Sequence, residues 1–371
     1  MKILHATKKY PDAIGGDAVV VSSLEDEQHM GHEVFILTSR CPEIITKDNV
    51  FMFGIFDKSS GLDRIGFKRI LSLLILSVTG FFLLKRIKPD IIHSHSPDIG
   101  FILSFQALFF KIPVINTCHG VTFSNRQFSS FKGYLEILLL KLGRFEKIVT
   151  VDGNSLPDLS EKIAKDAIYI PNGVDIEYFK KESNEMNNHL EARFLFTGRL
   201  EEQKGLPYLI QASKKLSGEI SDFKVVIVGD GSMYNELNGM VKNSGLGDKI
   251  EFTGRVDNER LRFLYHSSDI FVLPSVWEGM PLTLLEAWAC GLPVIVTDVG
   301  DISRICVDKE NAIIVSPKDP DALYDAMLML ARDKQLREKL GKSGENTVAG
   351  YSWHDVMMKY MDVYRSVIDQ S

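Results

Sequence analysis

The sequence predicts an α/β protein built from two domains with parallel sheets, and three observations lead to this fold class. Short apolar runs such as residues 269–275 and 293–298 recur along the chain, as expected of strands that are buried on both faces. The segment between two such runs has the length and pattern of a crossover helix, which parallel pairing requires. With 371 residues the chain is long enough for two domains of this kind.

Composition and charge exclude several classes of protein. The net charge of −6 argues against nucleic acid as the main partner. The four cysteines show no metal-type spacing and are typical of buried thiols in a reducing compartment. The N-terminus lacks the apolar core of a signal peptide, and the longest apolar stretch, residues 70–84, is shorter than the roughly 20 residues of a membrane span. We therefore expect a cytoplasmic protein that is peripheral to a membrane at most.

The first half, residues 1–170, is expected to form an N-terminal Rossmann-like domain. A strand at residues 2–6 leads into a loop that ends in Gly15 and Gly16, and a helix is expected from residue 17 to about residue 30. Further strands are expected at residues 31–38, 89–95, 113–120, 148–151 and 167–170.

The segment at residues 64–88 is an apolar helix flanked by lysines and arginines, and two interpretations are open. It is either a buried helix of the first domain, which the apolar composition favours, or an interfacial helix that docks on acidic lipid. Further along, residues 123–147 are aromatic and basic, and this region is expected to face an acceptor.

His119 follows the apolar run at residues 113–118. Ligands of open α/β sheets bind beyond the carboxyl ends of strands, which makes His119 a candidate site residue; a capped core histidine is the alternative.

The second half, residues 171–355, repeats the alternation of strand and helix and is expected to form a C-terminal Rossmann-like domain. The turn at residues 171–175 marks the boundary, and a final helix at about residues 356–371 is expected to pack back on the first domain. Gly229 and Gly231 follow a strand, but a dinucleotide fingerprint needs glycine where Tyr234 stands, which excludes a nicotinamide cofactor.

Two glutamates lie in the crossover segment between the runs at 269–275 and 293–298. Glu278 precedes Pro281, which is expected at the first position of a helix, and Glu286 lies about a turn inside that helix. Gly279 allows a ligand to approach the backbone, and the first-turn N–H groups offer an anion site. Two carboxylates beside such a site suggest a ligand with several hydroxyls and a phosphate; two helix-surface charges are the alternative.

Arg199 and Lys204 lie five residues apart in the loop after another apolar run. Glu201 and Glu202 stand between them, so a solvated loop is one interpretation. A cationic site beside the N-terminus of the helix that Pro207 opens is the other.

The stretch from Glu278 to Glu286, with Gly279 and the following Glu-Ala-x-Ala-x-Gly-Leu-Pro-Val, resembles the signature of the retaining glycosyltransferases of family four. Members of this family have the GT-B fold, in which two Rossmann-like domains face each other across a cleft. The glycine loop near Gly15, His119 and the turn at residues 171–175 extend the resemblance along nearly the whole chain.

The resemblance also implies roles for individual residues. Arg199 and Lys204 would hold the donor diphosphate, Glu278 and His119 would face the donor sugar, and Glu286 would bind the ribose. The further donor-binding residues that it implies are Gly15, Gly16, Asn172, Arg255, Val256, Gly279, Met280, Pro281 and Leu282.

The expected function is retaining transfer of a sugar from a UDP- or GDP-sugar to a hydroxyl of a glycan or a lipid-linked acceptor. Preorganised cations lower the barrier to departure of a diphosphate. Because no Asp-x-Asp motif bracketed by strand signals occurs, no metal and no cofactor are expected. Retention by a covalent carboxylate intermediate and the front-side reaction that the family implies are both open.

Two departures from the family pattern leave the choice of donor open. Arg304 stands where a glutamate usually closes the turn after Thr297, and Asp152 and Gly153 stand where many members have a serine. Two other functions also fit the sequence: a nucleotide-sugar epimerase of the same fold, and a non-catalytic subunit that binds a nucleotide and partners an active enzyme.

Overall fold

The chain forms two compact units, residues 1–172 with 353–371 and residues 173–352. The computed structural model describes residues 1–8, 10, 31–39, 48–54, 67–119, 131–181 and 192–370. The helix expected at residues 17–30, Gly15, Gly16 and residues 123–130 of the aromatic and basic region lie outside the described residues.

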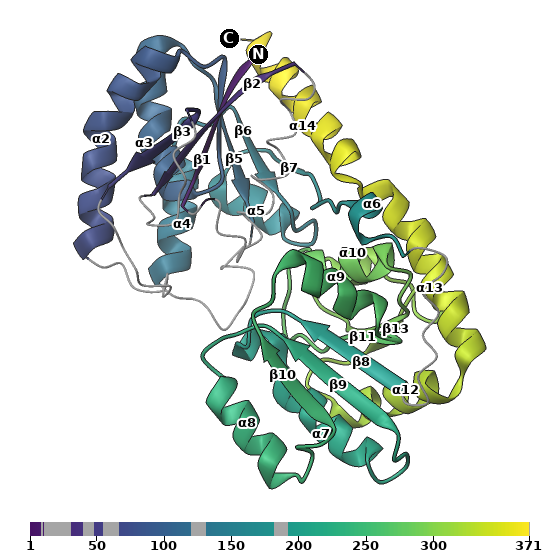
Figure 1. Ribbon diagram of the computed structural model, residues 1–371. Coiled ribbons are helices and arrows are strands. Elements are labelled where there is room, and N and C mark those ends of the chain that lie inside the picture. The colour runs from purple at the N-terminus through teal and green to yellow at the C-terminus, as the bar shows by residue number, and fades with distance from the viewer. Residues whose placement is uncertain are drawn as a thin grey trace. The chain divides into compact units, whose positions relative to one another are not determined.

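The first unit contains a parallel sheet in the order β3-β2-β1-β4-β5-β6-β7 (Figure 1). Its strands are β1 (Lys2–Thr7), β2 (Glu33–Ser39), β3 (Val50–Phe53), β4 (Ile91–Ser94), β5 (Val114–Cys118), β6 (Lys147–Thr150) and β7 (Ala167–Tyr169). Its helices are α2 (Phe67–Ile87), α3 (Pro97–Ala107), η2 (Leu108–Phe110), α4 (Phe131–Leu142), α5 (Leu156–Ile163) and α14 (Trp353–Ile368).

Successive side chains of a strand point to opposite faces of a sheet, and this alternation divides the core of the first unit into two layers. Leu4 and Ile92 pack into one cluster with residues of α2 to α5. Ile3 and Ile91 pack into another with the buried face of α14, which includes Tyr364. The yellow helix α14 accordingly lies on the sheet face opposite α2 and α3 in Figure 1.

Helix α2 is only partly covered by the rest of its unit. Leu76, Leu84 and Ile87 are buried, whereas Leu74 and Val78 on another face are exposed. By length and composition residues 69–87 are also apolar enough to cross a bilayer, although the buried face belongs to the core of the unit. The interpretation of this segment as a buried helix therefore holds for one face of α2 and is wrong for the other.

The second unit contains a parallel sheet in the order β10-β9-β8-β11-β12-β13. Its strands are β8 (Ala192–Thr197), β9 (Phe223–Val228), β10 (Ile250–Gly254), β11 (Ile270–Leu273), β12 (Val294–Thr297) and β13 (Ile313–Val315). Its helices are α6 (Ile176–Phe179), η4 (Glu202–Lys204), α7 (Leu206–Leu216), α8 (Tyr234–Asn243), α9 (Asn258–His266), α10 (Leu282–Ala289), α11 (Ile302–Ile305), α12 (Pro320–Arg332), α13 (Lys334–Val348) and η5 (Ala349–Tyr351).

Each sheet has one point at which the strand order reverses. In the first sheet β1 lies beside β4, and in the second β8 lies beside β11. Loops that leave neighbouring strands at such a point diverge to opposite faces of the sheet, and the space between them is where open α/β sheets bind ligands.

Candidate functional site

The loops after β8 and β11 come together at the point where the strand order of the second sheet reverses. The first loop carries Lys204 in η4, and the second carries Glu278 between β11 and α10. Backbone contacts join the loops: the Val276 N–H donates to the Gln203 carbonyl at 2.8 Å. The amide of Gln203 in turn donates to the Trp277 carbonyl at 3.0 Å. These bonds fix the relative position of the two loops.

Gly205 allows the close approach of these loops. Its φ of +64° lies in the left-handed region, and a Cβ at this position would come within 1.9 Å of the Pro274 carbonyl oxygen. A side chain here would push the loop that carries Lys204 away from β11.

The carboxylate of Glu278 accepts several hydrogen bonds inside this loop pair. Its Oε1 lies 2.6 Å from Nζ of Lys204 and 2.6 Å from Oγ of Ser275. Gln203 Nε2 donates to Oε2 at 3.4 Å. The side chain of Glu278 is only 6% exposed, so this is a nearly buried charge whose cation is Lys204.

Arg199 belongs to the same loop as Lys204 but lies in a different environment. Its side chain is exposed, and Nη2 lies 3.4 Å from Oε1 of Gln203. The two cations predicted to act together therefore differ in burial.

Helix α10 begins one residue later than the sequence suggested. Pro281 was expected at the first helical position, but with φ −75° and ψ 120° it is the N-cap, and the helix starts at Leu282. The prediction was wrong because proline satisfies the φ of both positions and only ψ separates them. Met280 and Pro281 are buried, whereas Gly279 and Leu282 on either side of them are partly exposed.

The turn after β12 packs against the loop that carries Glu278. The Asp301 N–H donates to the Gly279 carbonyl at 3.2 Å. A Cβ on Gly300, whose φ is +54°, would lie 2.0 Å from the Glu278 carbonyl oxygen. Arg304, which departs from the family pattern, lies 3.8 Å from a carboxylate oxygen of the buried Asp301.

Glu286 lies on α10 and accepts a hydrogen bond from the Tyr265 hydroxyl at 2.7 Å. The same hydroxyl lies 2.7 Å from Oγ1 of Thr197, at the end of β8. Burial raises the pKa of Glu286 to about 7, although the bond from Tyr265 favours the ionised form. The environment of Glu286 therefore favours the protonated carboxyl group more than water does.

The other residues predicted to bind a donor are placed as follows. Arg255 is exposed just after β10, with Nε 3.9 Å from a carboxylate oxygen of Asp230, and Val256 beside it is partly buried. Asn172 is buried and ends the first of the two units at the boundary turn.

In the first unit, four histidines gather at the carboxyl ends of β1, β4 and β5. His5 and His93 are register partners across β1 and β4, and His95 and His119 follow β4 and β5. Nδ1 of His95 lies 2.9 Å from Nε2 of His119. Among the described residues, His5, His93 and His95 each offer a ring nitrogen within 4.8 Å of the others, a spacing that a metal ion could use.

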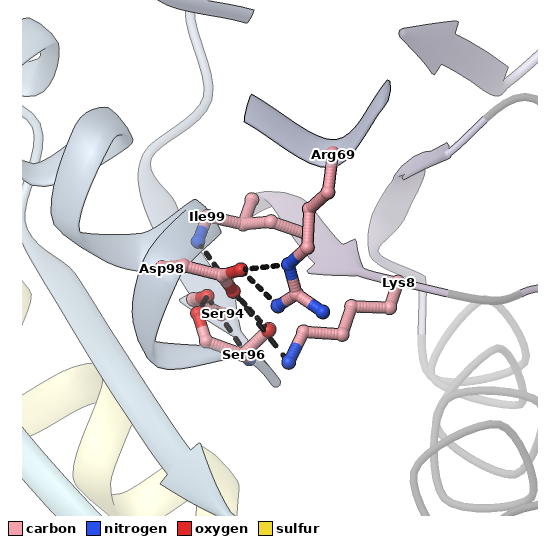
Figure 2. Close-up of polar contacts among 6 residues, drawn as sticks. All are labelled: Lys8, Arg69, Ser94, Ser96, Asp98 and Ile99. Carbon is pink, nitrogen blue, oxygen red and sulfur yellow. Dashed lines mark hydrogen bonds and ion pairs between the residues drawn. The ribbon is translucent and has the colours of Figure 1, made fainter. Parts of the chain in front are cut away.

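A buried carboxylate fixes the starts of α2 and α3 at this same edge. Asp98 accepts hydrogen bonds from Arg69 on α2 and from Oγ of Ser96, and Lys8 lies 3.6 Å away. Figure 2 shows both basic side chains converging on this carboxylate. Burial by itself would raise the pKa of Asp98, but Lys8, Arg69 and the hydrogen bonds outweigh it and hold the pKa well below its usual value.

Sequence reasoning missed four residues of these sites: Gln203, Ser275, Tyr265 and His95 as a partner of His119. Ser275 directly follows β11, which is a signal that could have identified it. The partnership of Tyr265 with Glu286 depends on how α9 and α10 lie beside the sheet, and no local pattern encodes it.

Two family models match this chain. The family model described as Glycosyl transferases group 1 matches residues 178–347, and that of Glycosyltransferase Family 4 matches residues 14–178. An Escherichia coli UDP-Gal:alpha-D-GlcNAc-diphosphoundecaprenol alpha-1,3-galactosyltransferase is 30% identical over 77% of this chain and 78% of its own length. A phosphatidyl-myo-inositol mannosyltransferase of Mycobacterium leprae is 29% identical over 75% of this chain and 74% of its own.

Other relatives match less of the chain or only its fold. An uncharacterized glycosyltransferase of Methanocaldococcus jannaschii is 36% identical over 48% of this chain and 46% of its own, so the match spans about half of each protein. Sucrose-phosphate synthase from Thermosynechococcus elongatus superimposes with a TM-score of 0.85 at 20% identity, and each chain is fully covered. On these matches the chain belongs to glycosyltransferase family 4, the glycosyl transferases group 1, and has the GT-B fold.

Proposed function

We propose that this protein transfers a sugar, with retention of anomeric configuration, from a UDP- or GDP-sugar to a hydroxyl of a glycan or lipid-linked acceptor. The observation that carries the proposal is the pairing of Lys204 with Glu278 where the strand order of the second sheet reverses. The names of the relatives support the substrate class, because the Escherichia coli enzyme is named for a UDP-sugar and a diphosphoundecaprenol-linked acceptor.

The proposed roles follow from the charges of the site. Negative charge grows on the diphosphate as the glycosidic bond breaks, and a preorganised cation stabilises that charge. Lys204 is held in place by Glu278, whereas the exposed Arg199 is free to follow the phosphates as they bind. We assign the diphosphate to these two cations, with no metal ion required.

The two carboxylates take different parts of the donor in this proposal. Glu278 binds hydroxyls of the sugar, and donor binding replaces part of its contact with Lys204. Glu286, about one turn inside α10, binds the ribose. His119 is proposed to contact the sugar, and the departing phosphate accepts the proton of the acceptor hydroxyl in a front-side reaction.

The direct test is to supply purified protein with UDP-, GDP- and ADP-sugars and a lipid-linked glycan acceptor, and to follow product by NMR of the anomeric proton. We expect one UDP- or GDP-sugar to give a product with the anomeric configuration of the donor. A product of inverted configuration would contradict retention. Interconversion of the donor without an acceptor would favour the epimerase.

We further propose that the protein is peripheral at the inner face of a membrane and docks through α2. Leu74, Val78 and Phe82 are 60%, 61% and 65% exposed and follow one another at four-residue spacing, so they line one side of the helix. The ring of Phe81 connects this side to η2. Its centroid lies 6.1 Å from the ring centroid of Phe82 and 5.8 Å from that of Phe109 in η2. We call Leu74, Val78, Phe82 and Phe109 the α2 surface.

The charges beside the α2 surface favour an anionic bilayer as its partner. Lys85, Arg86 and Lys88 at the end of α2 are exposed, and so is Lys111 after η2. Basic side chains next to exposed apolar residues are the pattern of an interfacial helix on acidic lipid. Such docking would bring the enzyme to a lipid-linked acceptor.

A further inference from the structure

Three histidines of the first unit form a continuous chain of ring contacts. Nδ1 of His5 lies 3.1 Å from Nε2 of His95, and Nδ1 of His95 lies 2.9 Å from Nε2 of His119. The planes of the His95 and His119 rings make an angle of 22°, so the two rings are nearly coplanar. His5 is fully buried and His95 is 5% exposed, so the chain runs from the core of the sheet to the end of β5.

The number of protons on the His95 ring limits how protons can be arranged along the three histidines. Burial and the neighbouring histidines lower the pKa of His95 well below its usual value, so at neutral pH the ring carries a single N–H. Because both ring nitrogens make a contact, one must donate and the other must accept.

Only two proton arrangements satisfy both contacts when all three rings are neutral. In one, His5 donates to His95 and His95 donates to His119, so that the proton of His119 is on Nδ1. In the other, His119 donates from Nε2, and its Nδ1 carries a lone pair. The direction of the chain therefore decides whether Nδ1 of His119 is a donor or an acceptor.

We propose that His95 is a positioning residue that fixes the tautomer and ring orientation of His119. The catalytic consequence rests on the proposed role of His119 beside the donor sugar; the fixed tautomer does not. A histidine that must present one kind of nitrogen to a substrate gains from a partner that excludes the other tautomer.

His93 provides a matched control, because it lies beside the chain without belonging to it. Its ring centroid is 4.0 Å from that of His95, but Nδ1 lies 2.6 Å from the Tyr364 hydroxyl and Nε2 lies 2.7 Å from Oγ1 of Thr117. The contact with Tyr364 attaches α14 to the sheet. A metal ion on His5, His93 and His95 would have to replace the contacts of His93 and His95, which argues against a metal site.

The test is to label the histidines with ¹⁵N and to record long-range ¹H–¹⁵N spectra, in which protonated and unprotonated ring nitrogens are well separated. The His119 signals are identified by their absence in His119→Gln. We expect one tautomer of His119 in the wild type and in His93→Phe. In His95→Leu we expect averaged signals of both tautomers, and in His95→Asn, whose amide replaces Nδ1, we expect most of the preference to return.

The outcomes separate this inference from the proposed function. An unchanged His119 pattern in His95→Leu, in a variant that melts like the wild type, would overturn the inference, and so would a stoichiometric zinc complex that moves the signals of His5, His93 and His95. If the tautomer averages, we expect kcat to fall by up to about 100-fold, the scale of a misplaced catalytic group. If the two tautomers of His119 average in His95→Leu and kcat does not change, the inference holds and His119 takes no part in the reaction.

Discussion

Lys204 and Glu278, which lie 74 residues apart in the sequence, form an ion pair of 2.6 Å between Nζ and Oε1. Both side chains are largely buried, at 12% and 6% exposed. A buried ion pair costs more to break than it contributes when intact, because loss of one partner leaves the other charge without compensation. The two residues should therefore respond to mutation as a unit.

Replacement of the two cations should separate catalysis from stability. Arg199→Ala and Lys204→Ala should each lower kcat by about 10²–10³-fold, the scale of one lost transition-state donor. Lys204→Ala should also lower the free energy of unfolding by roughly 2–4 kcal/mol because it leaves Glu278 unpaired, whereas the exposed Arg199 should cost little. Steady-state kinetics and denaturant unfolding measure the two effects, with Lys215→Ala, an exposed pair with Asp321, as the control. Near wild-type kcat in both site variants would refute the assignment.

The two glutamates should affect different kinetic constants. The ribose contact of Glu286 is remote from the bond that breaks, so Glu286→Gln should raise the donor KM and weaken binding of the free nucleoside diphosphate. Glu278 contacts the sugar, which gains positive charge in the transition state, so Glu278→Gln should chiefly lower kcat. Donor kinetics and calorimetry with the free nucleotide distinguish these patterns. Loss of nucleotide affinity in Glu278→Gln alone would reverse the two roles.

The raised pKa of Glu286 predicts a pH dependence of stability. The pKa is about 7 in the folded protein against 4.5 for an ordinary glutamate, so folding favours the protonated form. The free energy of unfolding is therefore highest below pH 4.5 and falls as the pH rises through 7, by about 3–4 kcal/mol in total. Glu286→Gln should remove this slope and be more stable than the wild type at pH 8. If the free energies of unfolding of the two proteins change in parallel between pH 5 and pH 8, the carboxyl group does not titrate in that range.

Transfer should not require a metal ion. Lys204 and Arg199 supply positive charge for the diphosphate, so activity should persist after dialysis against excess EDTA. The same treatment of a metal-dependent glycosyltransferase, assayed in parallel, is the control. Complete loss of activity that magnesium restores would contradict the proposal.

Membrane docking should depend on the α2 surface. The double variant Leu74→Ser, Phe82→Ser should co-sediment less with vesicles of acidic phospholipid than the wild type does. Salt should release the wild type from the vesicles, because it screens the basic side chains beside the α2 surface. Phe263→Ser with Met329→Ser, two exposed apolar side chains of the second unit, is the matched control. If both double variants bind the vesicles equally well, α2 is not the element that docks on the membrane.

An apolar run alone does not identify a strand in this sequence. Residues 270–273 and 294–297 are buried on both faces and were expected as β11 and β12, because the segment between them has the pattern of a crossover helix. By contrast β3 and β13 were not expected, although Val50–Phe53 and Ile313–Val315 are also entirely apolar. They are strands because a neighbouring strand, β2 for β3 and β12 for β13, presents its backbone to them.

The residues of the candidate site could be predicted from the sequence, but the contacts between them could not. A motif and its spacing single out Lys204 and Glu278, yet their ion pair depends on β8 lying beside β11. The same holds for His119, whose partner His95 was visible only as a histidine at a strand end. Local patterns identify which side chains do chemistry, while the strand order decides which of them meet.

The placement of α14 has a consequence for how the protein is made. Val356, Tyr360 and Tyr364 fill a core layer with Ile3 and Ile91, near the other end of the chain. On the ribosome, residues 1–172 emerge long before residues 353–371, so one face of the first sheet waits uncovered while the whole second unit is synthesised. The nascent chain therefore carries an open apolar face for about half of its elongation, and a premature stop before residue 353 would leave the N-terminal sheet in that state.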